Sequence, residues 1–268
     1  MKIVTPQLII GENDAFKNDI LGRKAYGETL LNLVVGSSDD LVISLDGKWG
    51  EGKTTFIKMW QGLLSESNVP NLYIDAFKND YVDDAFISLA STITGYAEEN
   101  MKKGSDEKLA ELKRKSKKVG GQLLSWSAKV AIKAATLGAI KDSDLDELKA
   151  MKGDISKGVS DIVGNLIEER LNTHLKDIEL FESFKNLLSE IPSHLENNDG
   201  KPLVIIIDEL DRCKPTFAIE VLEKVKHLFS VKNVVFVLVM HKDQLEESIR
   251  CVYGQNIDAH TYLQKFIT

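Results

Sequence analysis

Short apolar runs alternate with stretches of helical periodicity through the first hundred residues. Leu41–Leu45 is a strand-length run that ends at a glycine-rich segment, and Thr54–Trp60 after it has helical spacing. A second apolar run at Leu72–Phe77 precedes a helical stretch from Asp84 to Tyr96. Before these elements, Asp14–Val35 has the spacing of one helix, or of two helices broken by glycine. The alternation predicts a parallel sheet covered by helices on both faces.

The pattern is helical from Met101 to about Asp199 and then returns to the βα rhythm. The returning elements are predicted as a strand at Leu203–Ile207, a helix at Thr216–Phe229, a strand at Val234–Met240 and a helix at Asp243–Val252. This order predicts a single domain over 1–268, with the core in 1–100 and 200–268 and a helical insertion over 101–199.

Composition and charge narrow the class of protein. A net charge of −7 argues against a protein that coats nucleic acid, because such binding needs many cationic contacts to phosphate, and no sequence-specific nucleic-acid binding is predicted. The two cysteines, Cys213 and Cys251, lack metal-ligand spacing, which argues against a disulfide scaffold or a zinc site. The first residues lack the pattern of a signal peptide, and we expect a reducing cytoplasm.

The glycine-rich segment has the spacing Gly-x4-Gly-Lys-Thr of a phosphate-binding loop, or Walker A motif. Glycines allow its backbone N–H groups to converge on a phosphate, and the N-terminus of the following helix adds partial positive charge. Lys53 is expected to reach the β- and γ-phosphates and Thr54 to ligate Mg²⁺. The predicted nucleotide-binding residues of this segment are Gly47, Lys48, Trp49, Gly50, Glu51, Gly52, Lys53, Thr54 and Thr55.

An acidic pair follows the third apolar strand. Asp208 ends a run of five aliphatic residues, where a carboxylate can complete a magnesium site with Thr54. Glu209 beside it suits a base that polarises the attacking water. A GTPase would carry Asp-x-x-Gly and Asn-Lys-x-Asp at the corresponding places, whereas this chain has Asp-Glu-Leu-Asp from Asp208 and His-Lys-Asp-Gln from His241. ATP with Mg²⁺ is therefore the predicted ligand, and a GTPase is disfavoured.

A family resemblance extends these motifs over the whole chain except the detail of the insertion. Gly-Lys-Trp-Gly-Glu-Gly-Lys-Thr, Asp-Glu-Leu-Asp-Arg-Cys over Asp208–Cys213, and Tyr-Leu-Gln-Lys-Phe over Tyr262–Phe266 together resemble the KAP family of P-loop NTPases. Leu21–Arg23 and Asp75–Phe77 fit the same family. The resemblance implies a three-layer α/β/α sandwich with a parallel sheet, of the additional-strand, catalytic-glutamate type, carrying a helical insertion.

The resemblance also implies roles for individual residues. In its sheet order, 5-1-4-3-2, the strand Val234–Met240 lies between the loop strand and the acidic strand, and the residue after it senses the γ-phosphate. Here that residue is His241, where relatives usually carry aspartate. Arg23 corresponds to an adenine-proximal position, and Arg212 either couples to a neighbouring subunit or caps local carboxylates such as Asp211. A C-terminal helical lid is expected from the family and is missing from this sequence.

The insertion raises the question of partners. Residues 121–140 contain Lys129 and Lys133, and each central lysine costs about 2.5–3.5 kcal/mol on insertion scales, which argues against a membrane span. The basic stretch Lys113–Lys118 favours a solvated or partner-binding insertion, with peripheral contact to an anionic membrane as the alternative. We expect ATP hydrolysis coupled to a homo-oligomer or protein partner. A nucleotide switch with little turnover is the alternative, and the family suggests bacterial defence against phage.

Overall fold

The computed structural model describes residues 14–37, 41–82, 84–102, 107, 110–123 and 178–267. Its elements are α1 (Lys24–Gly36), β1 (Leu41–Asp46), α2 (Lys53–Glu66), β2 (Asn71–Asp75), α3 (Ala76–Asn79), α4 (Ala85–Asn100), β3 (Leu203–Asp208), η1 (Leu210–Arg212), α8 (Pro215–Lys226), β4 (Val234–Met240), α9 (Lys242–Tyr253) and α10 (Ala259–Leu263). Residues 110–123 and 178–194 are also helical and are called the insertion helices below.

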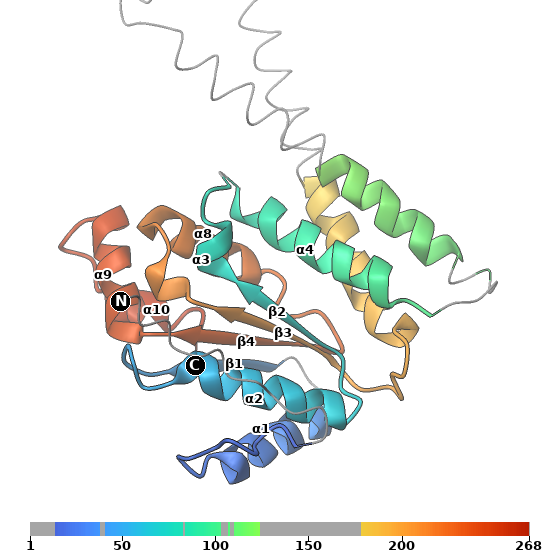
Figure 1. Cartoon of the computed structure of the whole chain (residues 1–268). Coiled ribbons are helices and arrows are strands. Elements are labelled where there is room, and N and C mark those ends of the chain that lie inside the picture. Colours follow the sequence, from blue (N-terminus) through green and yellow to red (C-terminus); the bar gives the residue numbers. More distant parts are fainter. Residues whose placement is uncertain are drawn as a thin grey trace, which may run out of the picture.

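The four strands form one parallel sheet in the order β1-β4-β3-β2 (Figure 1). Every residue of β3 and β4 is buried, which explains why these two central strands read as uninterrupted apolar runs. The predicted parallel sheet is confirmed, with Val234–Met240 between the loop strand and the acidic strand. Within the described residues β1 is an edge of the sheet, and the fifth strand implied beside it is not among them.

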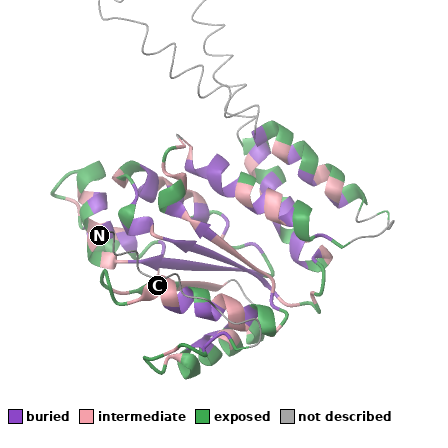
Figure 2. Cartoon of the chain, in the orientation of Figure 1, coloured by how far each residue is buried: buried purple, intermediate pink, exposed green. Residues whose placement is uncertain are grey.

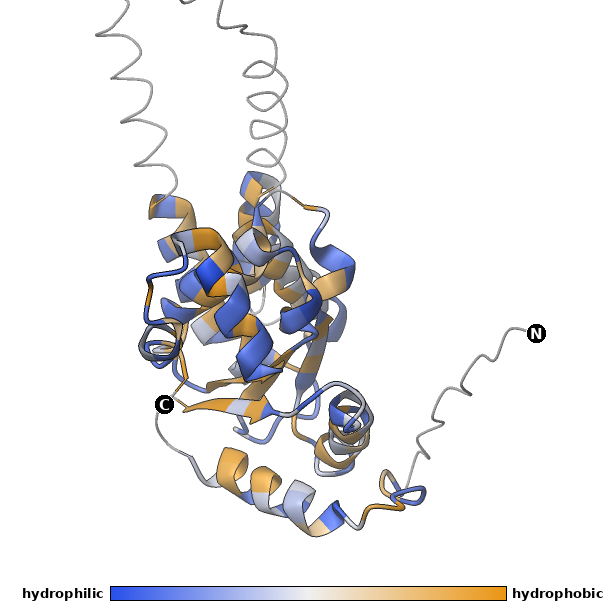
Figure 3. Cartoon of the chain, turned by 90° about the vertical axis from the view of Figure 1, so that its left-hand side faces the viewer, coloured by the Kyte–Doolittle hydropathy of each residue, from blue (hydrophilic) through white to orange (hydrophobic). Residues whose placement is uncertain are grey.

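Helices cover both faces of the sheet and complete the predicted three-layer sandwich (Figures 1 and 2). On one face α1 and α2 bury Val34, Phe56 and Trp60 against alternate residues of the central strands, such as Ile206. On the other face α4, α8 and the insertion helices pack in a larger cluster against the remaining strand positions, such as Ile207. In Figure 3 the strands are mostly apolar and the helices are striped, as this division between two cores requires.

The insertion helices belong to the core of the domain. Leu112 and Phe184, one from each helix, are almost fully buried in the cluster that contains β3. Lys115 Nζ lies 2.9 Å from a carboxylate oxygen of Glu190 and joins the two helices at the surface. Residues 124–177 lie outside the described residues. They include Lys129, Lys133 and most of the segment 121–140, for which the sequence argues against a membrane span. No helix in the described ranges is long and apolar enough to cross a membrane.

Several predicted element boundaries were wrong. The helical stretch predicted from Asp14 begins as a helix only at Lys24, and the helix predicted to end at Tyr96 continues to Asn100. The strand predicted over Leu72–Phe77 ends at Asp75, whose side chain accepts a hydrogen bond from the Lys78 backbone N–H at 3.1 Å and caps α3. The helix predicted over Thr216–Phe229 begins at Pro215 and ends at Lys226. Proline suits a first helical position because it needs no N–H donor there.

Candidate functional site

The phosphate loop lies between the carboxyl end of β1 and the amino end of α2, as the sequence predicts. Gly50 and Gly52 have φ angles of 84° and 78°, in the left-handed region where glycine is favoured. Gly47 donates its N–H to the carbonyl of Met240 at 3.2 Å, which ties the loop to the end of β4. A Cβ atom at Gly47 would come within 2.9 Å of a Glu51 carboxylate oxygen, so the loop closes tightly at this point.

The cationic side chain of the loop folds back over its own backbone. Lys53 Nζ donates to the carbonyls of Gly47 at 2.5 Å and Lys48 at 3.3 Å. The Lys48 N–H donates to Glu51 Oε2 at 2.8 Å, and Thr55 lies with Lys53 in the first turn of α2. The loop is therefore preorganised by bonds among its own residues, and Lys53 lies where it can exchange carbonyl partners for phosphate oxygens.

Asp208 ends β3 and is almost completely buried, with 1% of its surface exposed. Its carboxylate accepts hydrogen bonds from Tyr73 Oη at 3.0 Å and from the Glu209 backbone N–H at 2.7 Å. Burial is the main reason that the pKa of Asp208 is raised, and burial together with the Asp208 charge raises the pKa of Tyr73. The fold thus holds a carboxylate in a desolvated place and supports it with two donors.

Glu209 is brought together with Thr54 and Asp208. Thr54 Oγ1 donates to Glu209 Oε1 at 3.2 Å, although 155 residues separate the two in sequence. Arg212 Nε lies 2.7 Å from Glu209 Oε2, so its guanidinium pairs with Glu209 and not with Asp211. Glu209 has a φ of 63° and begins the tight turn η1. Burial and the nearby Asp208 charge raise the pKa of Glu209.

His241 lies at the end of β4, immediately before α9, and faces the loop. Its ring is 5.8 Å from that of Trp49, centroid to centroid, in an edge-to-face arrangement. Both ring nitrogens are buried and have no hydrogen-bond partner among the described residues, and Nε2 is 3.7 Å from an Asp243 carboxylate oxygen. A polar side chain in this state has spare capacity for a phosphate oxygen or a water molecule.

Arg23 reaches the loop from the segment before α1. Its Nη1 donates to the Gly52 carbonyl at 3.2 Å, and its guanidinium carbon lies 5.5 Å from the centroid of the Phe56 ring. Asp19 accepts a hydrogen bond from the Arg23 backbone N–H and lies 3.9 Å from its Nε. The structure thus places every predicted site residue at the loop or at the strand ends beside it.

Sequence reasoning missed three supporting residues. Tyr73 supports Asp208, and Asp46 Oδ1 accepts the Lys242 backbone N–H at 2.9 Å, which joins the end of β1 to the start of α9. Asp211, noted only within its motif, accepts a hydrogen bond from Trp49 Nε1 at 2.5 Å. No spacing in the sequence signals these contacts, because each depends on the order of the strands in the sheet.

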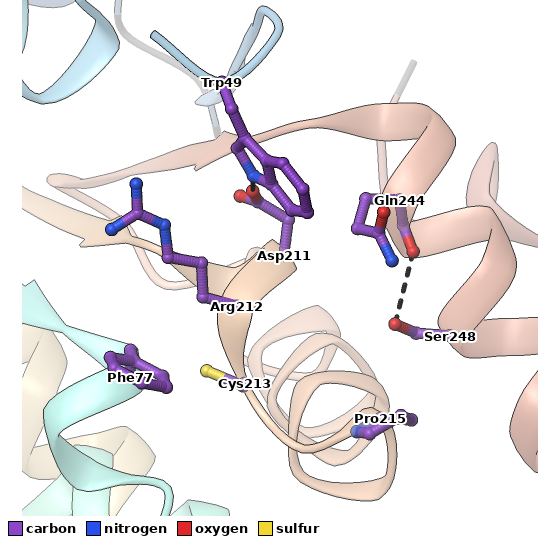
Figure 4. Close-up of a pocket in the computed structure, with 8 residues that line it drawn as sticks. All are labelled: Trp49, Phe77, Asp211, Arg212, Cys213, Pro215, Gln244 and Ser248. Atoms are coloured by element: carbon purple, nitrogen blue, oxygen red, sulfur yellow. Dashed lines mark hydrogen bonds between the residues drawn. The ribbon is translucent and has the colours of Figure 1, made fainter.

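A cavity of about 600 Å³ opens beside these groups. It is lined by Trp49, Phe77, Asp211, Arg212, Cys213, Pro215, Gln244 and Ser248, from the loop, α3, η1, α8 and α9 (Figure 4).

The donor set at the strand ends suits a magnesium ion. Thr54 offers a hydroxyl oxygen and Asp208 a carboxylate oxygen, which are the hard ligands that Mg²⁺ prefers, usually with waters and substrate phosphates completing the shell. The Thr54 hydroxyl and Asp208 both adjoin Glu209. These residues fit the ion that the phosphate loop implies.

Replacing Asp208 with asparagine should raise thermal stability. The raised pKa means that the folded protein holds this proton more tightly than the unfolded chain does, so stability falls as pH rises through the raised value. At neutral pH the buried charge is therefore a net cost. We expect Asp208→Asn to raise the Tm of the metal-free protein by about 2–4 °C, equivalent to about 1 kcal/mol.

Thermal melts at two pH values check this expectation. The gain should shrink as the pH is lowered, because the wild-type carboxyl then becomes neutral. A lower Tm for the asparagine variant at neutral pH would show that the charge itself stabilises the site.

Comparison with known proteins shows the family to which the chain is similar. A family model described as the KAP family P-loop domain matches residues 23–268. An uncharacterized protein of Methanocaldococcus jannaschii is 30% identical over 170 residues, which is 60% of this chain and 84% of that protein. The family match includes the phosphate loop, the acidic strand and the residues between them, so the resemblance inferred from the motifs is confirmed.

Proposed function

The chain belongs to the KAP family of P-loop domains, whose members are nucleotide-binding NTPases, and from this premise we propose that it is a magnesium-dependent ATPase. The observation that carries the proposal is the convergence of Thr54, Asp208 and Glu209. A hydroxyl and two carboxylates meet there although the loop and the acidic strand are far apart in the sequence. Binding a triphosphate needs only the loop, whereas this convergence adds the groups that hydrolysis requires.

In the proposed mechanism the loop N–H groups and Lys53 bind the β- and γ-phosphates of ATP. Thr54 and Asp208 would hold Mg²⁺, and the ion would supply positive charge against the phosphate oxygens. Glu209 orients a water molecule and accepts its proton. The water oxygen forms a bond to the γ-phosphorus as the bond from that phosphorus to the bridging oxygen of ADP breaks.

Two further residues complete the proposed site. His241 has two buried ring nitrogens without partners in the described part of the chain, so we assign it the γ-phosphate or the attacking water. Arg23 is assigned to the adenine end from the family resemblance, and its contact with the Gly52 carbonyl puts it beside the loop. The absence of the guanine-recognition pattern Asn-Lys-x-Asp, in whose place the chain has His-Lys-Asp-Gln from His241, supports adenine as the base.

A nucleotide switch with slow turnover is the second candidate, and one contact favours it. The pairing of Arg212 with Glu209 at 2.7 Å occupies an oxygen of the proposed base. In a switch this pair would persist after ATP binds, and ATP would be held with little hydrolysis. In an ATPase, Glu209 would engage the water once ATP and Mg²⁺ are bound.

We propose that ATP binding and hydrolysis change the conformation of the insertion, which then acts on a partner protein or on further copies of the chain. The insertion helices and β3, which ends at Asp208, belong to one buried cluster, so the insertion is joined to the element that carries the site through that shared core. Peripheral membrane contact, a cytoplasmic location and a role in phage defence stay predictions from the sequence and the family. Phage plating with the wild type and with a loop-lysine variant tests the last of these.

The test is phosphate release measured on the purified chain with ATP or GTP, with Mg²⁺ or with EDTA. We expect sustained release from ATP, at least tenfold slower release from GTP, and none above background in EDTA. Native mass spectrometry on the same samples gives the stoichiometry. Tight ATP binding with less than one phosphate released per chain would support the switch and contradict the ATPase. Equal rates with ATP and GTP would contradict the assignment of adenine.

A further inference from the structure

We propose that Trp49 and Asp211 form a positioning pair that holds the turn carrying Glu209 at a fixed place relative to the phosphate loop. This inference rests on the proposed function and adds to it two residues with no direct role in the chemistry. The pair adds a second link between the two halves of the site, beside the hydrogen bond from Thr54 to Glu209.

The contact between the two residues is direct. Trp49 Nε1 donates to Asp211 Oδ2 at 2.5 Å, and Figure 4 shows the indole nitrogen beside the carboxylate oxygen. Asp211 is 6% exposed, and among the described residues Trp49 is the side chain that donates a hydrogen bond to it. A buried carboxylate that loses its donor is left desolvated without a partner, which raises the free energy of the folded state. The structure therefore favours keeping this hydrogen bond.

The placement of Trp49 is not explained by packing in a core. The residue is 55% exposed, in contrast to Trp60, which is fully buried. Its position is defined by the hydrogen bond to Asp211 and by the edge contact with His241. An indole that is half exposed to water and held by two polar residues of the site suits an orienting role better than a role in stability.

The turn η1 connects this hydrogen bond to the proposed base. Asp211 lies in the three-residue turn η1 (Leu210–Arg212), which directly follows Glu209. The Arg212 N–H donates to the Glu209 carbonyl at 3.1 Å. Glu209 itself has a left-handed backbone, which leaves the turn few alternative conformations. A shift of Asp211 would therefore move Glu209 and Arg212 together, whereas the phosphate-binding groups of the loop would keep their places.

A structural alternative is that burial alone fixes the turn. Leu210 is fully buried, and Cys213 Sγ contacts the Glu209 carbonyl at 3.4 Å. If these contacts suffice, the bond between Trp49 and Asp211 is dispensable for turnover. The two alternatives differ in which measured quantity should change. If the pair positions Glu209, its loss lowers the rate of hydrolysis at saturating ATP. If burial alone fixes the turn, that rate stays the same.

The experiment compares Trp49→Phe, Asp211→Ala and Asp211→Asn in the full chain. Phenylalanine keeps a ring and removes the N–H, and asparagine keeps an oxygen acceptor. We expect single-turnover hydrolysis at saturating ATP to fall about tenfold in Trp49→Phe and in Asp211→Ala, with the Kd of a fluorescent ATP analogue changed less than twofold. Asp211→Asn should recover most of the rate. Phe77→Leu, a matched change at a 50% exposed ring of the same cavity without a polar contact, should leave the rate unchanged.

The double variant Trp49→Phe/Asp211→Ala separates the outcomes. If the residues act as a pair, its rate should be no lower than that of either single variant. Independent, multiplying losses would overturn the proposal, and so would single variants with the wild-type rate. A loss confined to Tm or to nucleotide affinity would establish the structural alternative. These failures are distinct from a failure of the proposed function, in which the wild type itself would show no turnover.

Discussion

Lys53→Ala is expected to remove measurable ATP binding and to reduce phosphate release to background. The Lys53 ammonium curls over the loop and is held by the carbonyls of Gly47 and Lys48, so it is already placed where phosphate oxygens would replace those carbonyls. Alanine leaves the loop backbone without the charge that the β- and γ-phosphates require. We expect the Kd for ATP to rise at least about 100-fold, equivalent to about 2.7 kcal/mol.

Isothermal titration with ATP and Mg²⁺ measures this effect, and Lys58→Ala is the matched control. Lys58 is an exposed lysine on the same helix, and no hydrogen bond or ion pair of its side chain is found among the described residues. The Lys58→Ala variant should bind ATP as the wild type does. Near-wild-type binding by Lys53→Ala would mean that the loop is a glycine turn with a surface lysine, and the nucleotide site would have to be sought elsewhere.

Glu209→Gln is expected to retain ATP binding and to lower the rate of hydrolysis at least about 100-fold. Glutamine keeps the shape of the side chain and an oxygen that can accept from Thr54 Oγ1, but it cannot take a proton from water. General-base catalysis is typically worth 10²- to 10⁴-fold, which sets the size of the loss. The variant also loses the ion pair with Arg212, and since that side chain is half exposed, little stability should be lost with it.

Quenched-flow hydrolysis and equilibrium binding on the same preparation measure both halves of this expectation. Glu247→Gln is the control, because it removes an equally charged carboxylate that pairs with Arg250 on the outer surface of α9. Unchanged phosphate release in Glu209→Gln would sink the hydrolytic mechanism and leave the nucleotide switch as the better description.

The sequence predicted the parts of the fold whose pattern is dictated by burial or by backbone conformation. β3 is surrounded on all sides, so its residues must be aliphatic, and the strand was predicted to within one residue of its end. Gly50 and Gly52 adopt conformations that other residues avoid, and the loop was recognised by them. The family match then confirmed the resemblance that these motifs suggested.

What the sequence did not predict depends on contacts between distant segments. Ala76 and Phe77 fit a strand by composition. They are helical because the side chain of Asp75 caps the start of α3. Tyr73 reaches Asp208 because β2 and β3 are neighbours in register. Trp49 and Asp211 are 162 positions apart, follow strands that β4 separates, and meet through a single hydrogen bond.

Two hydrogen bonds at the base of the phosphate loop connect it to the segment around His241. Gly47 donates to Met240, and Asp46 accepts from Lys242, so the loop and the first turn of α9 share an anchor on either side of His241. The insertion helices pack on α4, on the opposite face of the sheet from α2. A movement of the loop on nucleotide binding would therefore reach α9 directly, as it would reach the turn η1 through Trp49.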